Sequence, residues 1–160
     1  MSEELTPLSP THFTAKFVGG DGSIICATGD AVIETGPGTW ALRPVFAVMD
    51  MSNLAFPDVV ALLDVPSPAF YDLTVRDGYA YVCHNTAGLR IYDLSNPSAP
   101  ALVNTFNSPG FCKDVALSGD YAYIADQSSL QILDVSDPAN PTFVSSLAMP
   151  SAATALHVRG

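Results

Sequence analysis

Positive charge is what this 160-residue sequence has least of. It holds 6 Lys and Arg residues against 16 Asp and Glu residues, a formal net charge of −10. Binding to a nucleic-acid backbone or to an anionic membrane surface depends on Lys and Arg placed against phosphates. The sequence therefore predicts an acidic, soluble protein without a nucleic-acid partner.

Long apolar runs and a secretory leader are missing as well. No stretch approaches the roughly 20 apolar residues of a membrane-spanning helix, so we expect no membrane insertion. A signal peptide starts with basic residues, whereas this chain starts with Glu3 and Glu4, followed by Pro7 and Pro10. Either the mature protein is intracellular or its true N-terminus lies upstream. Residues 1–12 are predicted to be a frayed end.

The familiar signatures of catalysis are also missing. There is no Walker loop, no dinucleotide glycine fingerprint after a strand, no Gly-x-Ser-x-Gly and no His-Glu-x-x-His. The three histidines are scattered, and the three cysteines are too few for a disulfide framework or a zinc finger. We therefore expect a protein that is not an enzyme and carries no cofactor.

An internal repeat is plainly present. The segment from Tyr71 to Val82 matches the segment from Lys113 to Ile124, an offset of 42 residues (113 − 71). Leu89 to Pro100 matches Leu130 to Pro141, an offset of 41 (130 − 89). A weaker copy, from Val48 to Pro57, precedes them. A fixed period of this kind predicts a repeat architecture.

Each repeat is predicted to form four short strands. In the second copy they are Leu73–Arg76, Tyr79–Cys83, Leu89–Leu94 and about 102–106. The Asp77-Gly78 pair between the first two is a strong hairpin signal, because glycine adopts positive φ without steric cost. Four strands in about 42 residues are typical of a propeller blade. The predicted fold class is all-β, a β-propeller array of about three four-stranded blades plus one strand of a fourth.

A family resemblance supports this fold. The Leu89-Arg90-Ile91-Tyr92-Asp93 and Leu130-Gln131-Ile132-Leu133-Asp134 segments, with the Tyr-Ala-Tyr hairpins before them, resemble the LVIVD repeat. The resemblance is strongest over residues 59–160. It implies a β-propeller common in secreted or cell-surface proteins, and it brings no shared catalytic residues. The first repeat departs from the pattern, because it lacks the Tyr-Ala-Tyr hairpin and carries an insertion.

The predicted blades cover residues 13–66, 67–108 and 109–150 of one repeat domain spanning 13–160, and residues 151–160 begin a fourth. Closed propellers have about 4–8 blades, so three would leave an open wedge with exposed sheet faces. Two explanations remain open. The chain is a piece of a longer propeller, or copies of it assemble as a homo-oligomer to complete a ring.

Carboxylates recur at two repeat positions. Asp50, Asp93 and Asp134 each stand two residues before a serine, and a local turn explains this pattern better than a cation site does. Asp72 and Asp114 begin the innermost strands of successive blades, where a ring of carboxylates could hold a cation or an amine. The alternative is that each steadies its loop by hydrogen bonding.

The most site-like cluster contains Cys83, His84, Cys112 and Lys113. The two loops that hold these residues belong to the same face of a propeller. Two thiolates and an imidazole could bind a soft metal. Alternatively, Cys83 and Cys112 form a disulfide in an oxidising compartment, or each is a small buried hydrophobe.

The insertion at residues 28–40 interrupts the first repeat and contains the only tryptophan, Trp40. Repeat insertions often lie on the binding face, and tryptophan is enriched among binding hot spots. The alternative is a longer hairpin whose Trp40 packs on its own blade. Candidate ligand-binding residues are therefore Trp40, Asp72, His84, Lys113 and Asp114.

The function expected from these observations is a non-catalytic propeller module that binds a protein or carbohydrate ligand, or acts as a scaffold. By the family resemblance it would belong to a larger secreted or surface protein. A module that only spaces other domains is a further alternative. The enzymatic alternative is a fragment of a hydrolase or lactonase with a metal or carboxylate ring in its central channel. That alternative needs more inward carboxylates than Asp72 and Asp114 supply.

Overall fold

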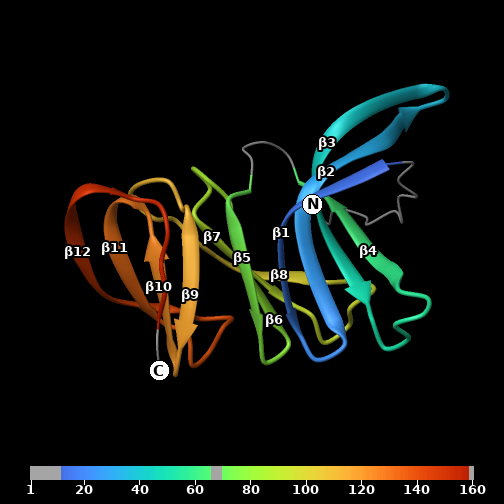
Figure 1. The fold of residues 1–160 in the computed structure, drawn as a ribbon. Coiled ribbons are helices and arrows are strands. Elements are labelled where there is room, and N and C mark those ends of the chain that lie inside the picture. Colours follow the sequence, from blue (N-terminus) through green and yellow to red (C-terminus); the bar gives the residue numbers. More distant parts are fainter. Residues whose placement is uncertain (1–11, 66–69, 159–160) are drawn as a thin grey trace.

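The structure is a computed structural model that describes residues 12–65 and 70–158. Its described part is built of strands arranged as three separate four-stranded antiparallel sheets. The sheets stand side by side in sequence order and do not close into a ring (Figure 1). The predicted fold class, an all-β partial propeller, is confirmed. The expected frayed end falls almost entirely outside the described residues.

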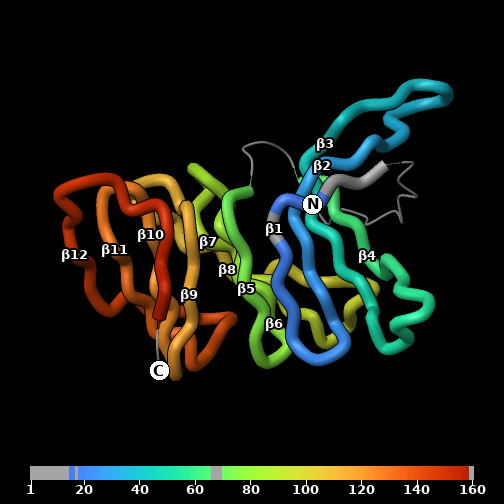
Figure 2. Tube along the Cα trace, viewed as in Figure 1, coloured from blue at the N-terminus to red at the C-terminus, as the bar shows by residue number. Residues whose placement is uncertain are grey.

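Each sheet is one blade formed from four consecutive strands. Blade 1 contains β1 (His12–Asp21), β2 (Ile24–Gly36), β3 (Thr39–Asp50) and β4 (Asp58–Asp64). Blade 2 contains β5 (Asp72–Arg76), β6 (Tyr79–Cys83), β7 (Leu89–Asp93) and β8 (Ala101–Phe106). Blade 3 contains β9 (Asp114–Ser118), β10 (Tyr121–Ala125), β11 (Gln127–Asp134) and β12 (Thr142–Ala153). The first strand of each blade faces the middle of the fan, and the fourth lies at its rim (Figure 2).

The turns that define the repeat have the predicted chemistry. Asp77 and Gly78 both have positive φ, 52° and 76°, which is the conformation of a tight two-residue hairpin. The Asp-x-Ser segments are local turns, in which the serine N–H donates to the aspartate carboxylate at 2.7, 2.7 and 2.9 Å. The structural interpretation of these repeated aspartates is therefore confirmed.

Apolar side chains pack between successive blades. Between blades 1 and 2, Phe46 stacks on Tyr92 with ring centroids 4.9 Å apart. Between blades 2 and 3, a second buried cluster joins Tyr81, Leu89 and Ile91 to Ile124 and Leu133. Two buried clusters of the described residues thus lie between blades, which is how a repeat protein stabilises each unit through its neighbours. A third cluster lies within blade 1.

The C-terminal segment differs in detail from the predicted fourth blade. Strand β12 continues to Ala153, so residues 151–153 belong to the third sheet. Residues 154–158 form no strand. They nevertheless run back along β9 (Figure 2), where the Leu156 N–H donates to the carboxylate of Asp114. Residues 154–158 therefore lie where the first strand of a fourth blade was expected, but they form no strand there.

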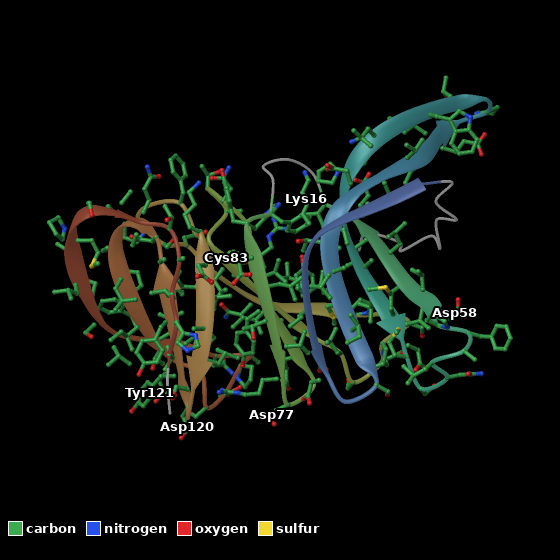
Figure 3. All side chains as sticks on the ribbon, viewed as in Figure 1. Lys16, Asp58, Asp77, Cys83, Asp120 and Tyr121 are labelled. Carbon is green, nitrogen blue, oxygen red and sulfur yellow. A yellow bond between two sulfur atoms is a disulfide. The ribbon has the colours of Figure 1, made fainter. Side chains whose placement is uncertain are left out.

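The insertion in blade 1 is a long two-stranded hairpin. The pairing of β2 with β3 is regular from Ile24, which pairs with Asp50, up to Glu34, which pairs with Trp40. The upper half of this hairpin projects beyond the rest of the molecule (Figure 1). It rises on the side where Cys83 lies, whereas Asp77 and Asp120 lie at the opposite end of the blades (Figure 3). We call these the disulfide face and the turn face.

Candidate functional site

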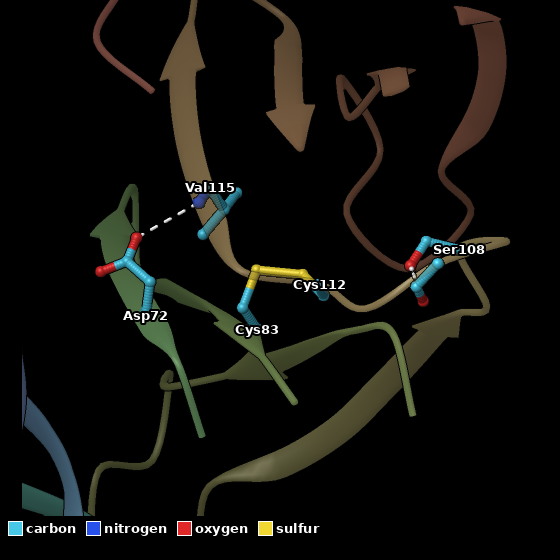
Figure 4. The surroundings of a disulfide bond; sticks show 6 residues. Asp72, Cys83, Ser108, Cys112 and Val115 are labelled. Carbon is cyan, nitrogen blue, oxygen red and sulfur yellow. Dashed lines mark hydrogen bonds between the residues drawn. A yellow bond between two sulfur atoms is a disulfide. The ribbon is translucent and has the colours of Figure 1, made fainter. Parts of the chain in front are cut away.

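A disulfide joins blades 2 and 3 at the disulfide face. Cys83 ends β6 and Cys112 precedes β9, and their sulfur atoms are bonded with the Cα atoms 5.0 Å apart (Figure 4). Both residues are fully buried. Next to the bond, the Cys112 N–H donates to the Asn85 carbonyl at 3.1 Å. Of the three alternatives left open by the sequence, the structure selects the disulfide, so these two sulfurs are not free thiolate ligands.

The imidazole of His84 is buried and does not lie at the surface. Its side chain is only 1 % exposed and packs against the ring of Phe70, with centroids 4.9 Å apart. Within the described ranges, no group of three or more His, Cys, Asp and Glu side chains could hold a metal. The candidate metal set of Cys83, His84 and Cys112 is therefore not assembled as a metal site.

Lys113 is held between aromatic rings. Its Nζ lies 3.4 Å from the centroid of the Tyr71 ring and 5.4 Å from that of Phe111. A cation over an aromatic face is attracted by about 0.5–1 kcal/mol at an exposed site. Phe111 remains 40 % exposed. Lys113 therefore lies against two aromatic rings at the disulfide face.

A groove of about 660 Å³ opens beside Phe111 on this face. Two loops, Asp126 with the start of β11, and the end of β12 form it, so segments of blades 2 and 3 contribute to one surface. Its apolar lining includes Pro109, Phe111, Met149 and Pro150. Its polar lining includes Thr86, Ser108, Gln127 and Ser128. Mixed aromatic, apolar and hydroxyl surfaces in a concave site are typical of binding sites.

A buried carboxylate fixes the floor of this groove. Asp126 is fully buried, and its Oδ1 accepts from the N–H and the hydroxyl of Ser129 at 2.6 and 2.7 Å. Its Oδ2 accepts from Gln131 Nε2 and from the Gly110 N–H, both at 3.3 Å. A buried charge is tolerated when its lone pairs are satisfied in this way. The network ties the loop at 108–112 to Asp126, between β10 and β11, and to the start of β11.

The close approach of the loop at 108–112 to Asp126 requires a glycine. A Cβ atom at Gly110 would lie 1.9 Å from the main-chain oxygen of Asp126. No side chain fits at that separation, so the loop can lie against Asp126 only because residue 110 has none. The groove is consequently preformed by a disulfide, a buried carboxylate network and a backbone contact.

Asp72 and Asp114 do come together, at the inner strands of blades 2 and 3. Burial, followed by the hydrogen bond and the negative charge of Asp114, raises the pKa of Asp72 to about 7. Asp72 also accepts from the Val115 N–H at 3.2 Å. Asp114 accepts from the Leu156 N–H in the same way. Both carboxylates thus link successive units of the chain.

Trp40 lies apart from this cluster, at the tip of the long hairpin opposite Glu34. Its side chain is 52 % exposed, so most of the indole is not packed on the blade. It shares the disulfide face with the groove but belongs to a different blade. The exposed indole is compatible with the predicted role of Trp40 in binding, which stays a prediction.

Sequence reasoning missed the groove and the Asp126 network. Asp126 occupies the repeat position of His84, because Ala125 pairs with Asp114 as Cys83 pairs with Asp72. A change from histidine to aspartate at a repeat position is a visible signal. The partners of Asp126 lie three, five and sixteen residues away, and no spacing rule gathers them.

Known structures share this fold at low identity. A computationally designed protein, Ika4, aligns with 12 % identity and a TM-score of 0.64 over 100 % of this chain and 89 % of its own. Sqt1 of Saccharomyces cerevisiae aligns with 7 % identity and a TM-score of 0.66 over 95 % of this chain. A functionally unknown protein of Desulfotomaculum acetoxidans aligns with 14 % identity and a TM-score of 0.55 over 90 %.

The chain spans 40 % of Sqt1 and 57 % of the Desulfotomaculum acetoxidans protein. No curated protein sequence matches it significantly. The described part contains no helix long and apolar enough to cross a membrane. The LVIVD repeat model matches residues 71–108 and 109–148, which are blades 2 and 3 with their connecting loops. The chain therefore contains two adjacent LVIVD repeats, which confirms the resemblance seen in the sequence.

Proposed function

We propose that this chain is a non-catalytic β-propeller repeat module that binds a segment of a partner protein in the groove of the disulfide face. The observation that carries the proposal is the preformed groove between blades 2 and 3, with the half-exposed ring of Phe111 at its edge. A preformed site loses little conformational entropy on binding, which favours recognition without a folding step.

The lining favours a peptide over a charged small molecule. Proline, phenylalanine and methionine side chains offer apolar contacts to a chain, and the hydroxyl and amide groups of Ser108, Ser128 and Gln127 can bond its main chain. The net charge of −10 would attract a segment carrying Lys or Arg. We therefore propose an extended, neutral or basic peptide segment as the ligand.

We further propose that the module works outside the cytosol, in a secreted or surface protein. A disulfide between two fully buried cysteines supports this, because such bonds persist in oxidising compartments and are rare in the cytosol. The family resemblance points to the same location.

The enzymatic alternative gains little support from the site. It assigned catalysis to inward carboxylates, yet Asp72 and Asp114 each accept a main-chain N–H from the following unit. Carboxylates used in this way join blades.

The proposal is tested by selecting peptides from a displayed random library on the whole chain and measuring their affinity by fluorescence anisotropy. Phe111→Ala should weaken binding by at least about tenfold, the cost of about 1.4 kcal/mol. Phe56→Ala is the matched control, because Phe56 is 79 % exposed on the loop after β3, towards the turn face. Failure to select any peptide, or equal losses in both variants, would contradict the proposal.

A further inference from the structure

The outward face of blade 3 repeats a face that is buried elsewhere in the molecule. Strand pairing places Tyr121, Tyr123 and Ala125 opposite Asp134, Ile132 and Leu130. It places Tyr79, Tyr81 and Cys83 opposite Asp93, Ile91 and Leu89. The residues of blade 2 that pack against blade 3 therefore have apolar equivalents on blade 3 itself. The equivalent residues are Tyr121, Tyr123, Ala125, Leu130 and Ile132.

The two copies of this face differ in what covers them. On blade 2, Tyr81, Leu89 and Ile91 are at most 2 % exposed because blade 3 lies on them. On blade 3, Tyr121 is 41 % exposed, and Leu147, which pairs with Leu130, is 62 % exposed. The outward face of blade 3 has the residues against which a following blade would pack, and no further described blade lies on it.

A complementary surface is present at the turn-face end of blade 1, whereas Ala27 and Ala47, further along the same face, are already buried. Blade 2 packs against blade 1 through Leu73, Ala80, Tyr92 and Leu94. The hairpin registers align these four with Val18, Ile25, Met49 and Met51 of blade 1. Gly19 faces Leu73, since its Cβ would lie 2.8 Å from Leu73 Cδ1. Its neighbour Val18 therefore points away from blade 2, and it is 61 % exposed.

One further contact fits this arrangement. The repeat places Val18 where Leu73 and Val115 lie in the next two blades. The Val115 N–H donates to Asp72, and the place of Val115 after blade 3 is taken by Leu156, whose N–H donates to Asp114. An incoming blade 1 would bring the Val18 N–H to the same carboxylate and would displace residues 154–158, which form no strand.

We propose that the outward face of blade 3 binds blade 1 of a second copy of this chain, head to tail. The contact would repeat the blade-on-blade packing that the chain already forms twice, with apolar side chains of matching positions on both sides. Because the two surfaces are different, the association is heterologous, and it either closes into a ring or continues as an open array. The proposal does not depend on peptide binding in the groove.

The test is the solution mass of the whole chain and of two face variants, measured by light scattering after gel filtration. Ile132→Arg places a charge on the blade 3 face, and Val18→Arg places one on the blade 1 face. The wild type should assemble, either as one discrete closed oligomer or as a concentration-dependent series of larger species, and each variant alone should be monomeric. Thr105→Arg, on the exposed rim strand β8, adds the same charge elsewhere and should assemble like the wild type.

Mixing the two variants makes the test specific for a head-to-tail contact. The Ile132→Arg protein keeps an intact blade 1 face, and the Val18→Arg protein keeps an intact blade 3 face. Their equimolar mixture should give a dimer and nothing larger. Circular dichroism and affinity for a selected peptide should be unchanged in both variants, which shows that they are folded. A monomeric wild type, variants that still assemble, or a mixture that stays monomeric would each overturn the proposal.

Discussion

The main-chain N–H of Leu156 donates a hydrogen bond to the carboxylate of Asp114, 42 residues earlier in the sequence. Asp72 accepts from the Val115 N–H in the same way, at a separation of 43 residues. In both pairs the aspartate begins an inner strand, and the donor lies at the corresponding place in the following unit. The segment after β12 therefore continues the repeat, although it forms no strand.

The first prediction concerns this link. In the monomeric Val18→Arg background no second copy displaces residues 154–158. There, Asp114→Ala removes the acceptor of the Leu156 amide, so the amide hydrogen should exchange with solvent at least about tenfold faster than in Val18→Arg alone. Hydrogen exchange followed by NMR measures this directly. Asp120→Ala, at an exposed turn, is the control and should leave the exchange rate unchanged. Equal exchange with and without the Asp114→Ala change in the Val18→Arg background would show that the bond is not formed.

The second prediction concerns the three cysteines. Burial raises the pKa of Cys26 to about 12, so its thiol should not react while the protein is folded. A colorimetric thiol titration should therefore count no thiol in the native protein and one in urea. It should count three after reduction in urea. Three thiols in urea without reductant would contradict the Cys83–Cys112 disulfide.

The third prediction is a pH dependence of stability. The pKa of Asp72 is raised to about 7, first by burial and then by Asp114, whereas an unfolded aspartate titrates near about 4. Between these values the unfolded state gives up its proton first. Stability contributed by this group is therefore greatest at low pH and is lost as pH rises from about 4 to about 7.

Asp72→Asn cannot ionise but keeps an acceptor for the Val115 N–H. The variant should lose less free energy of unfolding than the wild type between pH 5 and pH 8, by about 1 kcal/mol, because water still screens this partly exposed carboxyl. Urea unfolding at both pH values measures the difference. Asp58→Asn, at an exposed position, is the control. Identical pH dependence in the wild type and the Asp72→Asn variant would refute the raised pKa.

The repeat and its turns could be predicted from the sequence because they depend on residues close together in the chain. Asp77-Gly78 encodes a tight hairpin by its positive φ values, and Asp93 bonds the N–H of Ser95 two residues later. Such local preferences recur in every blade. They define four strands per unit without any knowledge of long-range contacts.

The groove could not be predicted, because it depends on contacts between blades. Sequence left the pairing of Cys83 with Cys112 as one of several alternatives, since three irregular cysteines fix no connectivity. The burial of His84 against Phe70 and the approach of Gly110 to Asp126 arise only once the loops of two blades meet. Asp72 and Asp114 were found because they recur at one repeat position.

The fourth prediction concerns Trp40. Its indole is 52 % exposed at a hairpin tip, so Trp40→Ala should change the free energy of unfolding by less than about 0.5 kcal/mol. Urea unfolding followed by circular dichroism is the measurement. The variant should nevertheless weaken capture of a protein partner that contacts the hairpin. A loss of several kcal/mol would show that the indole packs as part of the core.

The central claim is that ligands bind in the groove of the disulfide face. The most direct test is an NMR titration of the labelled chain with a selected peptide, following each main-chain amide. The shifted amides should cluster in the loops at 84–88 and 108–113, at residues 126–128 around the start of β11, and at the end of β12, residues 149–152. Shifts centred on the turn face, around Asp77, Asp120 and the loop at 51–57, would contradict it.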